Sequence, residues 1–138
     1  MKEFIVHSEA ELSEVADFLL SLLHDRPVVT LTGEVGAGKT ALVKSICRLL
    51  GVIDDVSSPT FTIVNTYLTD TGRLVYHIDL YRLVTVEELV QIGIDDYLYS
   101  GEITFIEWPA FISGNLPDNT LEIRLEHIDK QTRKIVIL

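Results

Sequence analysis

The sequence predicts an α/β fold of three layers, in which central parallel strands are flanked by antiparallel hairpins and helices cover both faces. Two observations lead to this prediction. An apolar, β-branched run at residues 28–32 feeds a glycine-rich loop that opens into a helical pattern. Further along, two strand patterns end in acids, Asp79 and Glu107, and hairpin signals flank them. With 138 residues, 47% of them hydrophobic, we expect a single domain, 1–138, with a packed core.

The glycine-rich loop at residues 33–40 matches the phosphate-binding pattern G-x-x-x-x-G-K-[ST] in full. Its glycines let backbone N–H groups approach phosphate oxygens, and the following helix directs the positive end of its dipole at the same anion. We expect Lys39 to reach the β- and γ-phosphates and the Thr40 hydroxyl to ligate Mg²⁺. A chance match in a glycine-rich turn is the alternative, but the strand before the loop and the helix after it favour a P-loop NTPase-like fold.

The charge balance limits the possible partners. The net charge is −10, whereas a protein that grips nucleic acid alone needs Lys and Arg for the phosphate backbone. An RNA-related role would therefore run through a partner protein. The one cysteine, Cys47, lies in a helical apolar pattern, which predicts a packed thiol and no disulfide within the chain. No run of about 18 apolar residues and no signal-peptide pattern occurs, so we expect a cytoplasmic protein without membrane contact.

The chain before the loop predicts a short strand and a helix. The strand covers residues 4–6, and Ser8 fits the helix N-cap with Glu11 as its capping-box partner. Apolar residues at helical spacing extend this helix to residue 23, and Pro27 ends the connection to the first core strand.

The segment after the second helix carries three hydroxyl residues, Ser57, Ser58 and Thr60. Their hydroxyls could bond phosphate or complete a Mg²⁺ shell, and ordinary turn chemistry is the alternative. Residues 61–69 and 73–80 then predict the two strands of a hairpin around an Asp-Thr-Gly turn.

Two acids are expected at strand ends. His77 and Asp79 share one face of the second hairpin strand, and Asp79 lies near its carboxyl end. If this strand runs parallel to residues 28–32, Asp79 points toward the phosphates, because ligands sit outside the carboxyl ends of parallel strands. A solvated carboxylate is the alternative. Glu107 ends an apolar strand in the same way; one acid would hold Mg²⁺ and the other would orient the attacking water, and the sequence leaves open which does which.

The remaining signals are structural. Thr85 predicts the N-cap of a short helix with Glu88 as its capping-box partner, and Gly93 predicts its end. Residues 95–97 are expected in a connection without an assigned role.

Near the end of the chain, Trp108 is expected to pack against its neighbours more readily than to stack on a base. Residues 120–126 and 133–138 predict an antiparallel hairpin on the edge of the sheet.

Four motifs, taken together, resemble one family. They are the loop at residues 33–40, Ser58-Pro59-Thr60-Phe61, Tyr76-His77-Ile78-Asp79-Leu80-Tyr81-Arg82 and Ile106-Glu107-Trp108-Pro109. The sequence closely resembles the bacterial TsaE (YjeE) family over nearly its whole length. The resemblance implies a Mg²⁺-dependent ATPase, weak alone, that is required for threonylcarbamoyl modification of tRNA adenosine next to the anticodon. It also implies that the protein acts on the TsaB–TsaD complex, meets tRNA only through these partners and does not transfer the group itself.

The resemblance implies roles for individual residues. Thr40 and Glu107 would ligate Mg²⁺, and Asp79 would be an essential acid near the γ-phosphate. Thr60 matches a switch-like threonine, and Trp108 matches a functional tryptophan at the partner-facing edge. The residues placed against ATP are Glu9, Gly33, Gly36, Ala37, Gly38, Lys39, Thr40 and Ala41. The chain departs from many relatives in having Ala110 where they carry an acid.

Two other functions would use the same loop. A small-molecule kinase usually needs an arginine-bearing lid, but the six arginines are scattered along this sequence. Arg82 is the nearest candidate for an arginine finger, with a structural ion pair as its alternative. A non-hydrolysing nucleotide sensor would bind ATP and dock on a partner without turnover.

Overall fold

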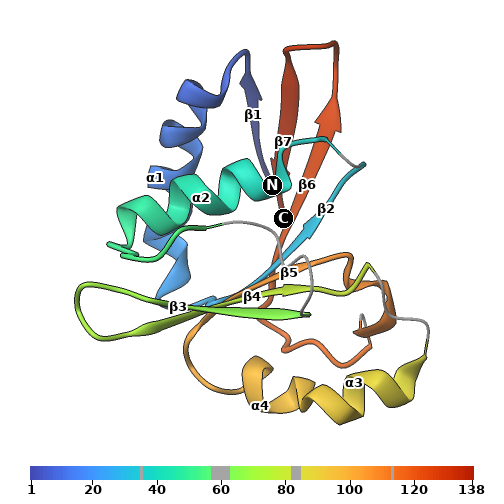
Figure 1. Ribbon diagram of the computed structural model, residues 1–138. Coiled ribbons are helices and arrows are strands. Elements are labelled where there is room, and N and C mark those ends of the chain that lie inside the picture. Colours follow the sequence, from blue (N-terminus) through green and yellow to red (C-terminus); the bar gives the residue numbers. More distant parts are fainter. Residues whose placement is uncertain (35, 57–62, 82–84, 113) are drawn as a thin grey trace.

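The computed structural model describes residues 1–34, 36–56, 63–81, 85–112 and 114–138. Within them, one mixed sheet contains seven strands in the order β1-β7-β6-β2-β5-β4-β3 (Figure 1). The strands are β1 (Lys2–Val6), β2 (Val28–Thr32), β3 (Val64–Leu68), β4 (Leu74–Asp79), β5 (Ile103–Glu107), β6 (Leu121–His127) and β7 (Arg133–Ile137). The helices are α1 (Leu12–Leu23), α2 (Lys39–Leu49), α3 (Val86–Ile92) and α4 (Ile94–Leu98), with 3-10 turns η1 (Glu9–Glu11) and η2 (Pro109–Ile112). The predicted α/β fold is confirmed.

The middle of the sheet is parallel. Strand β2 pairs in parallel with β5 and with β6, and β5 pairs in parallel with β4. Antiparallel pairs lie on both sides: β3 on β4 at one side, and β7 on β6 with β1 on β7 at the other. The carboxyl ends of β2, β5 and β4 therefore meet at one edge of the sheet, as the sequence analysis expected for Asp79.

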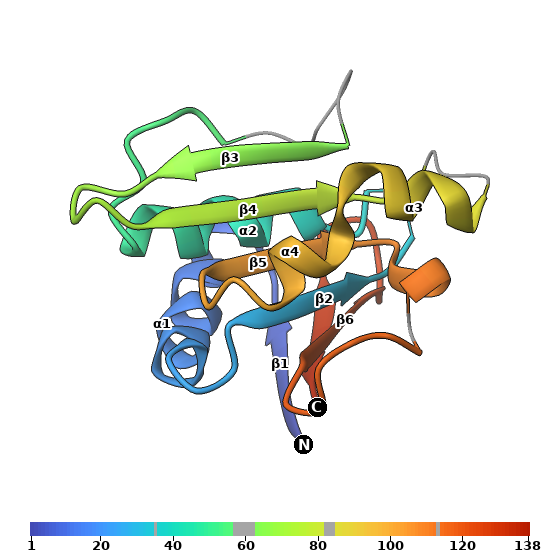
Figure 2. The ribbon, with the colours of Figure 1, turned by 90° about the horizontal axis from the view of Figure 1, so that it is seen from below.

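Helices cover both faces of this sheet. Helices α1 and α2 lie on one face, and α3 and α4 lie on the other (Figures 1 and 2). A larger apolar core packs the first pair against the sheet, and a second core packs α3 and α4 against its other face. Cys47 is fully buried in the larger core, and burial raises the pKa of its thiol to about 12, which agrees with the predicted packed thiol. Among the described helices, none has the length and apolar composition that a bilayer crossing requires.

The position of the last hairpin differs from the prediction. Strands β6 and β7 form the expected antiparallel pair, but β6 lies inside the sheet, next to β2. Strand β1 pairs with β7 and takes the edge position. The inward side chains of β6, Leu121, Ile123 and Leu125, are buried in the larger core, so this strand gains more apolar burial inside the sheet than an edge position would give.

The predicted capping boxes do not form as expected. Ser8 has the extended backbone of an N-cap, but its side chain makes no capping hydrogen bond. The Glu11 carboxylate instead accepts the backbone N–H of His7 at 2.8 Å, one residue earlier than a capping box requires. The Thr85 hydroxyl likewise donates to the Glu88 carboxylate at 3.3 Å, and Thr85 makes no side-chain cap to the backbone.

The region after α3 is more helical than predicted. Gly93 ends α3 with φ at +69°, as expected for a glycine at this position. Residues 94–98 form the short helix α4, although the sequence predicts a connection at residues 95–97. Two of its side chains, Ile94 and Leu98, complete the second core, so packing rather than helix propensity accounts for this turn of helix.

The core position of β6 gives a stability prediction with a matched control. Ile123 is fully buried, whereas Ile128, just after the same strand, is 53% exposed. We expect Ile123→Ala to lower the free energy of unfolding by about 2–5 kcal/mol through lost burial and a residual cavity. Ile128→Ala should change it by less than about 0.5 kcal/mol. Urea unfolding of both variants measures the difference, and equal losses would contradict the placement of β6 in the core.

Candidate functional site

A cavity of about 400 Å³ opens where β4 and β5 end beside the start of α2. Most of the predicted site residues line it. The residues that line it are Glu9, Gly36, Gly38, Lys39, Thr40, Ala41, Asp79, Tyr81, Glu107 and Trp108.

The loop between β2 and α2 surrounds the Lys39 ammonium. Lys39 is the first residue of α2 and is only 6% exposed. Its Nζ donates to the carbonyl oxygens of Gly33 at 2.5 Å and Glu34 at 3.2 Å. The positive end of the α2 dipole lies at the same place, so the cavity has two sources of positive potential for an anion.

Two glycines give this loop its path. Gly38 is the N-cap of α2 with φ at +101°, a conformation that residues with a Cβ rarely adopt. Gly33 ends the loop's approach from β2, and a Cβ there would lie 2.6 Å from the carbonyl oxygen of Leu125. The loop therefore depends on glycine for backbone conformation at one end and for space at the other.

The two predicted acids are neighbours on adjacent strands. Asp79 and Glu107 are direct partners in the parallel pairing of β4 with β5, so their side chains leave the sheet on the same face. Glu107 is almost fully buried, and the Asp79 Oδ1 accepts the backbone N–H of Tyr81 at 3.0 Å. Burial raises the pKa of the Asp79 carboxyl above its ordinary value, the Tyr81 N–H opposes this, and the Glu107 charge adds to the rise.

The same acids act on Lys39. Burial lowers the pKa of the Lys39 ammonium, while the charges of Glu107 and Asp79 raise it. Burying the charges of Lys39, Asp79 and Glu107 costs hydration free energy, and the attraction between the ammonium and the carboxylates reduces that cost. The cluster holds one cation and two anions in a small volume, which is the charge pattern of a site for a phosphate with a divalent cation.

Trp108 covers the ammonium. Its ring centroid lies 4.3 Å from the Lys39 Nζ, and its ring also contacts that of Tyr81, with 5.0 Å between centroids. Its backbone has φ at +58°, which is unusual for a bulky residue. This conformation, directly after the end of β5, turns the indole over the cavity instead of continuing the strand.

Sequence reasoning missed a buried partner of Glu107. The His77 Nε2 lies 2.6 Å from the Glu107 Oε2, and the His77 Nδ1 lies 3.1 Å from the Tyr67 hydroxyl. The signal in the sequence was the alternation that puts His77 on the same strand face as Asp79. What the sequence lacked was the pairing of β4 with β5, which brings Glu107 beside that face.

Two of the predicted residues that the structure describes, Gly33 and Ala37, are not among the residues that line the cavity. The Gly33 carbonyl oxygen accepts a hydrogen bond from Lys39, and Ala37, within the loop, is fully buried. Thr60 and the rest of its Ser-Pro-Thr motif lie outside the described residues, as does Arg82. Glu9, in η1, lines the cavity, and its approach to a nucleotide stays a prediction.

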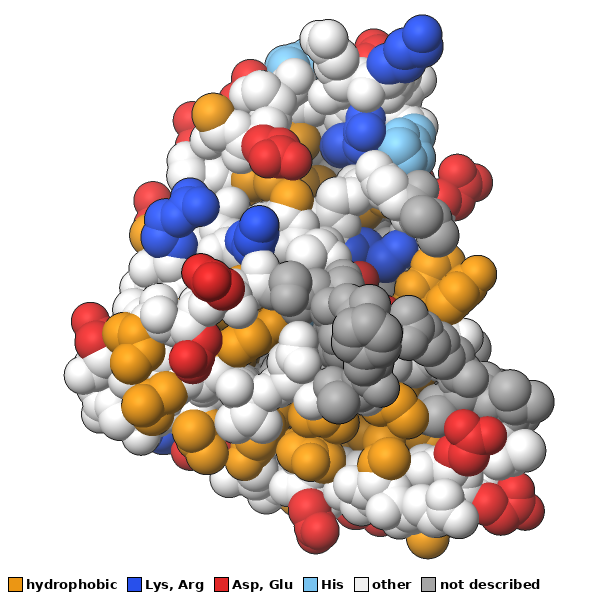
Figure 3. Space-filling model, in the orientation of Figure 1, with side chains coloured by type: hydrophobic (Ala, Val, Ile, Leu, Met, Phe, Trp, Pro, Cys, Tyr) orange, Lys and Arg blue, Asp and Glu red, His pale blue; other side chains and the backbone are white. Residues whose placement is uncertain are grey.

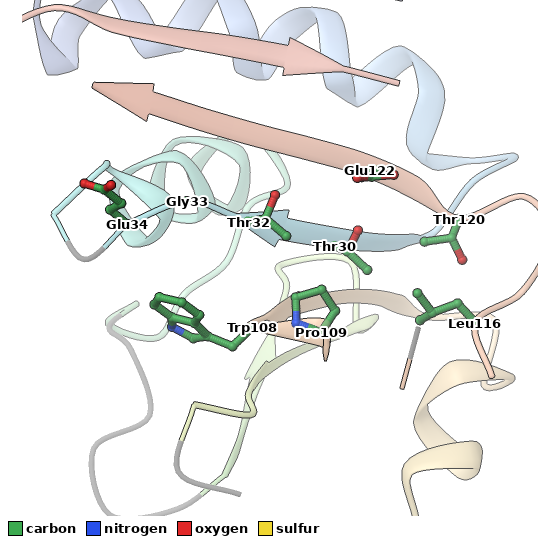
Figure 4. Close-up of a pocket in the computed structure, with 9 residues that line it drawn as sticks. All are labelled: Thr30, Thr32, Gly33, Glu34, Trp108, Pro109, Leu116, Thr120 and Glu122. Atoms are coloured by element: carbon green, nitrogen blue, oxygen red, sulfur yellow. The ribbon is translucent and has the colours of Figure 1, made fainter. Parts of the chain in front are cut away.

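A second, larger cavity shares Trp108 with the first. This groove of about 700 Å³ runs along one face of β2 and β6, with Trp108 and Pro109 opposite a floor that includes Thr30 and Thr32 (Figure 4). Its other lining residues are Gly33, Glu34, Leu116, Thr120 and Glu122. Among the described residues that line this groove, none is lysine or arginine, so they offer no cation for phosphate, and the smaller cavity at Lys39 is the better candidate for a nucleotide site.

The donor set fits a hard divalent cation. Carboxylate and hydroxyl oxygens are the protein ligands that Mg²⁺ prefers, and the cavity presents Asp79, Glu107 and Thr40. The described residues contain no group of three His, Cys, Asp or Glu side chains that could hold a metal by themselves. A cation here would therefore share its coordination with phosphate oxygens and water, as Mg²⁺ does at nucleotide sites.

The raised pKa of Asp79 predicts a pH-dependent stability difference. As the pH rises above 3.8, the unfolded chain loses the Asp79 proton before the folded protein does, so ionisation disfavours the folded state. Asparagine does not ionise. We expect Asp79→Asn to become more stable than the wild-type protein as the pH rises from 3.8 through the raised pKa of Asp79 in the folded state, with no gain below pH 3.8.

Thermal unfolding between pH 3 and pH 7 measures this effect. Asp118→Asn, at an exposed turn, is the control for removing one acid from the chain. A constant difference between Asp79→Asn and wild type across this range would contradict the burial of the Asp79 carboxyl.

Comparison with known proteins agrees with the resemblance. A family model described as "Threonylcarbamoyl adenosine biosynthesis protein TsaE" matches residues 6–135. The chain is 37% identical over 117 residues to the tRNA threonylcarbamoyladenosine biosynthesis protein TsaE of Treponema pallidum, covering 84% of each chain. It is 38% identical to the protein of the same name from Aquifex aeolicus, covering 99% of this chain and 96% of the relative.

A solved structure supports the same assignment. The crystal structure of YdiB from Bacillus subtilis superposes with a TM-score of 0.74 at 28% identity, over 99% of this chain and 83% of YdiB. The family model, the relatives and the fold agree over nearly the full length, and the chain belongs to the TsaE family.

Proposed function

We propose that this chain is a Mg²⁺-dependent ATPase subunit that supports threonylcarbamoyl modification of tRNA adenosine next to the anticodon. The observation that carries the proposal is the cavity in which the Lys39 ammonium, the start of α2 and the carboxylates of Asp79 and Glu107 converge. These are the parts that ATP hydrolysis at a phosphate-binding loop requires. The family description supports the pathway.

In this proposal the loop and Lys39 bind the triphosphate. The amides at the start of α2 and the Lys39 ammonium carry positive potential, and the buried position strengthens their attraction for phosphate oxygens. Glu9 lines the same cavity and would approach the ribose or base. Trp108 limits access of water to the Lys39 ammonium.

Thr40 and Glu107 would hold Mg²⁺, which neutralises charge on the β- and γ-phosphates when bound. Asp79 would orient the attacking water near the γ-phosphate and accept its proton. Burial raises the pKa of Asp79, which makes the carboxylate a better proton acceptor than a solvated one. Thr60, implied by the resemblance as a switch-like threonine, keeps that proposed role.

The proposed partners are TsaB and TsaD, with tRNA bound only through them. The net charge of −10 does not suit direct contact with a phosphate backbone. On the face shown in Figure 3, Lys and Arg side chains are interspersed with Asp and Glu rather than gathered in one basic area. Trp108, at the rim of the cavity and of the neighbouring groove, is the proposed point of partner contact.

Substitutions in the cavity should separate binding from turnover. We expect Lys39→Ala to abolish measurable ATP binding. Asp79→Asn and Glu107→Gln should retain much of the ATP affinity and lower the rate of phosphate release by about 100-fold or more, because each removes charge stabilisation needed in the transition state. Glu122→Gln, a carboxylate of the neighbouring groove, should behave as wild type.

Isothermal titration calorimetry with ATP and a phosphate-release assay measure the two properties. Wild-type turnover in Asp79→Asn and Glu107→Gln would contradict the catalytic assignment. If the wild-type protein and the variants that bind ATP all lack turnover, a nucleotide sensor is favoured. ATP-dependent phosphorylation of a metabolite would favour a kinase.

Partner dependence gives a second test. We expect slow ATP hydrolysis by the isolated protein and a clear acceleration when the TsaB–TsaD pair is added, because the isolated site presents no described arginine to stabilise the γ-phosphate. A pull-down with and without ATP, followed by turnover measurements on the complex, tests this. Equal turnover with and without the partners would contradict it.

A further inference from the structure

A buried hydrogen-bonded chain links the edge of the sheet to the candidate site. Tyr67 in β3, His77 in β4 and Glu107 in β5 lie on three neighbouring strands. The Tyr67 hydroxyl lies 3.1 Å from the His77 Nδ1, and the His77 Nε2 lies 2.6 Å from the Glu107 Oε2. Their exposed fractions are 3%, 0% and 3%, so solvent does not compete for these bonds.

The directions of these hydrogen bonds follow from the chemistry of the groups. A carboxylate oxygen accepts, so the His77 Nε2 is the donor to Glu107. In the neutral ring the Nδ1 is then an acceptor, and the Tyr67 hydroxyl donates to it. A hydroxyl that donates to Nδ1 favours the tautomer in which the Nε2 of His77 carries the proton.

The chain leaves the two oxygens of Glu107 in different environments. Oε2 is held by a short hydrogen bond to the His77 ring, which is fully buried and whose strand partner, Phe105, belongs to the larger core. Among the described residues, Oε1 has no hydrogen-bond partner, and Glu107 lines the cavity beside Lys39 and Thr40. Free rotation of the carboxylate would break the bond to His77.

We propose that His77, fixed by Tyr67, is a positioning residue that orients the Glu107 carboxylate so that Oε1 is available to a divalent cation in the cavity. Neither residue touches the nucleotide or the cation in this proposal. It rests on the proposed function to the extent that Glu107 is taken as a cation ligand. A hydrogen bond from histidine also raises the metal affinity of a carboxylate, because it holds the carboxylate in one orientation.

The test measures the affinity of the nucleotide complex for the metal, not turnover. Mn²⁺ is titrated, by electron paramagnetic resonance, into protein that carries the non-hydrolysable ATP analogue AMP-PNP. We expect His77→Leu to weaken Mn²⁺ binding by about 10- to 100-fold, the usual effect of losing a partner of a metal ligand. AMP-PNP affinity in EDTA should stay near wild type, because Lys39 and the loop are unchanged.

Conservative variants separate positioning from a merely structural role. His77→Gln keeps a donor near the Nε2 position and should recover part of the Mn²⁺ affinity. Tyr67→Phe removes only the hydroxyl and should weaken Mn²⁺ binding by a smaller factor, with the fold retained. The matched controls are His24→Leu at an exposed histidine and Tyr76→Phe on the other face of β4.

A double substitution gives the sharpest outcome. In a Glu107→Gln background, His77→Leu should weaken Mn²⁺ binding no further, because the group it orients has been removed. The inference is overturned if folded His77→Leu and Tyr67→Phe variants bind Mn²⁺ as wild type does. It is also overturned if the loss of Mn²⁺ affinity in these variants adds in full to the loss in Glu107→Gln. Unchanged Mn²⁺ affinity in Glu107→Gln alone would also overturn it while ATP binding stands. Failure of the wild-type protein to bind AMP-PNP would overturn the proposed function, and the inference with it.

Discussion

The parallel pairing of β2, β5 and β4 is the constraint on which the site depends. It places the Lys39 loop after β2 and the acids at the ends of β5 and β4 at one edge of the sheet. The register is strongly specified, because Phe105 and Ile106 are buried on opposite faces of β5, in different cores. A slip of one residue would exchange those faces and turn Glu107 away from the cavity, so core packing enforces the geometry of the site.

The charges at this edge are costly to bury, and they are arranged to reduce each other's cost. Lys39 and Glu107 are nearly inaccessible to water. Burial lowers the pKa of Lys39 and raises that of Asp79, so that it favours the neutral form of each side chain. Each acid opposes that shift at Lys39. In the proposed function a triphosphate would bring negative oxygens to Lys39 and its Mg²⁺ would bring positive charge to the acids. The charges of the bound nucleotide and cation would then balance both the Lys39 ammonium and the two carboxylates, whose burial the protein alone offsets only in part.

The sequence was sufficient for the loop, the strand that precedes it, the two strand-end acids and the hairpin that ends in Asp79. Each of these depends on local periodicity or on a contiguous motif. It was not sufficient for features that depend on which strands become neighbours. The last hairpin lies inside the sheet because β6 pairs with β2 and because β1, more than 120 residues away in the chain, pairs with β7. The contact of His77 with Glu107 also requires the pairing of β4 with β5.

The two capping boxes show a different limit. The residue types at Ser8 and Thr85 were right for N-caps, and both have extended backbones at helix starts. Their side chains nevertheless bond elsewhere or make no capping bond, because the exposed acids have other partners within reach. The capping pattern at Thr85 located the start of α3, whereas Ser8 precedes the 3-10 turn η1 and α1 begins only at Leu12; neither pattern determined the hydrogen bonds.

The position of Trp108 bears on whether this residue packs a core or serves the site. It is not among the described residues that form or pack against either apolar core. Its left-handed backbone costs on the order of 1–3 kcal/mol, and such strain persists only where surrounding contacts determine it. Those contacts are the Tyr81 ring and the Lys39 ammonium, both of which line the cavity. A packing role would need no strain and no charged neighbour, so the geometry favours a role for Trp108 at the cavity.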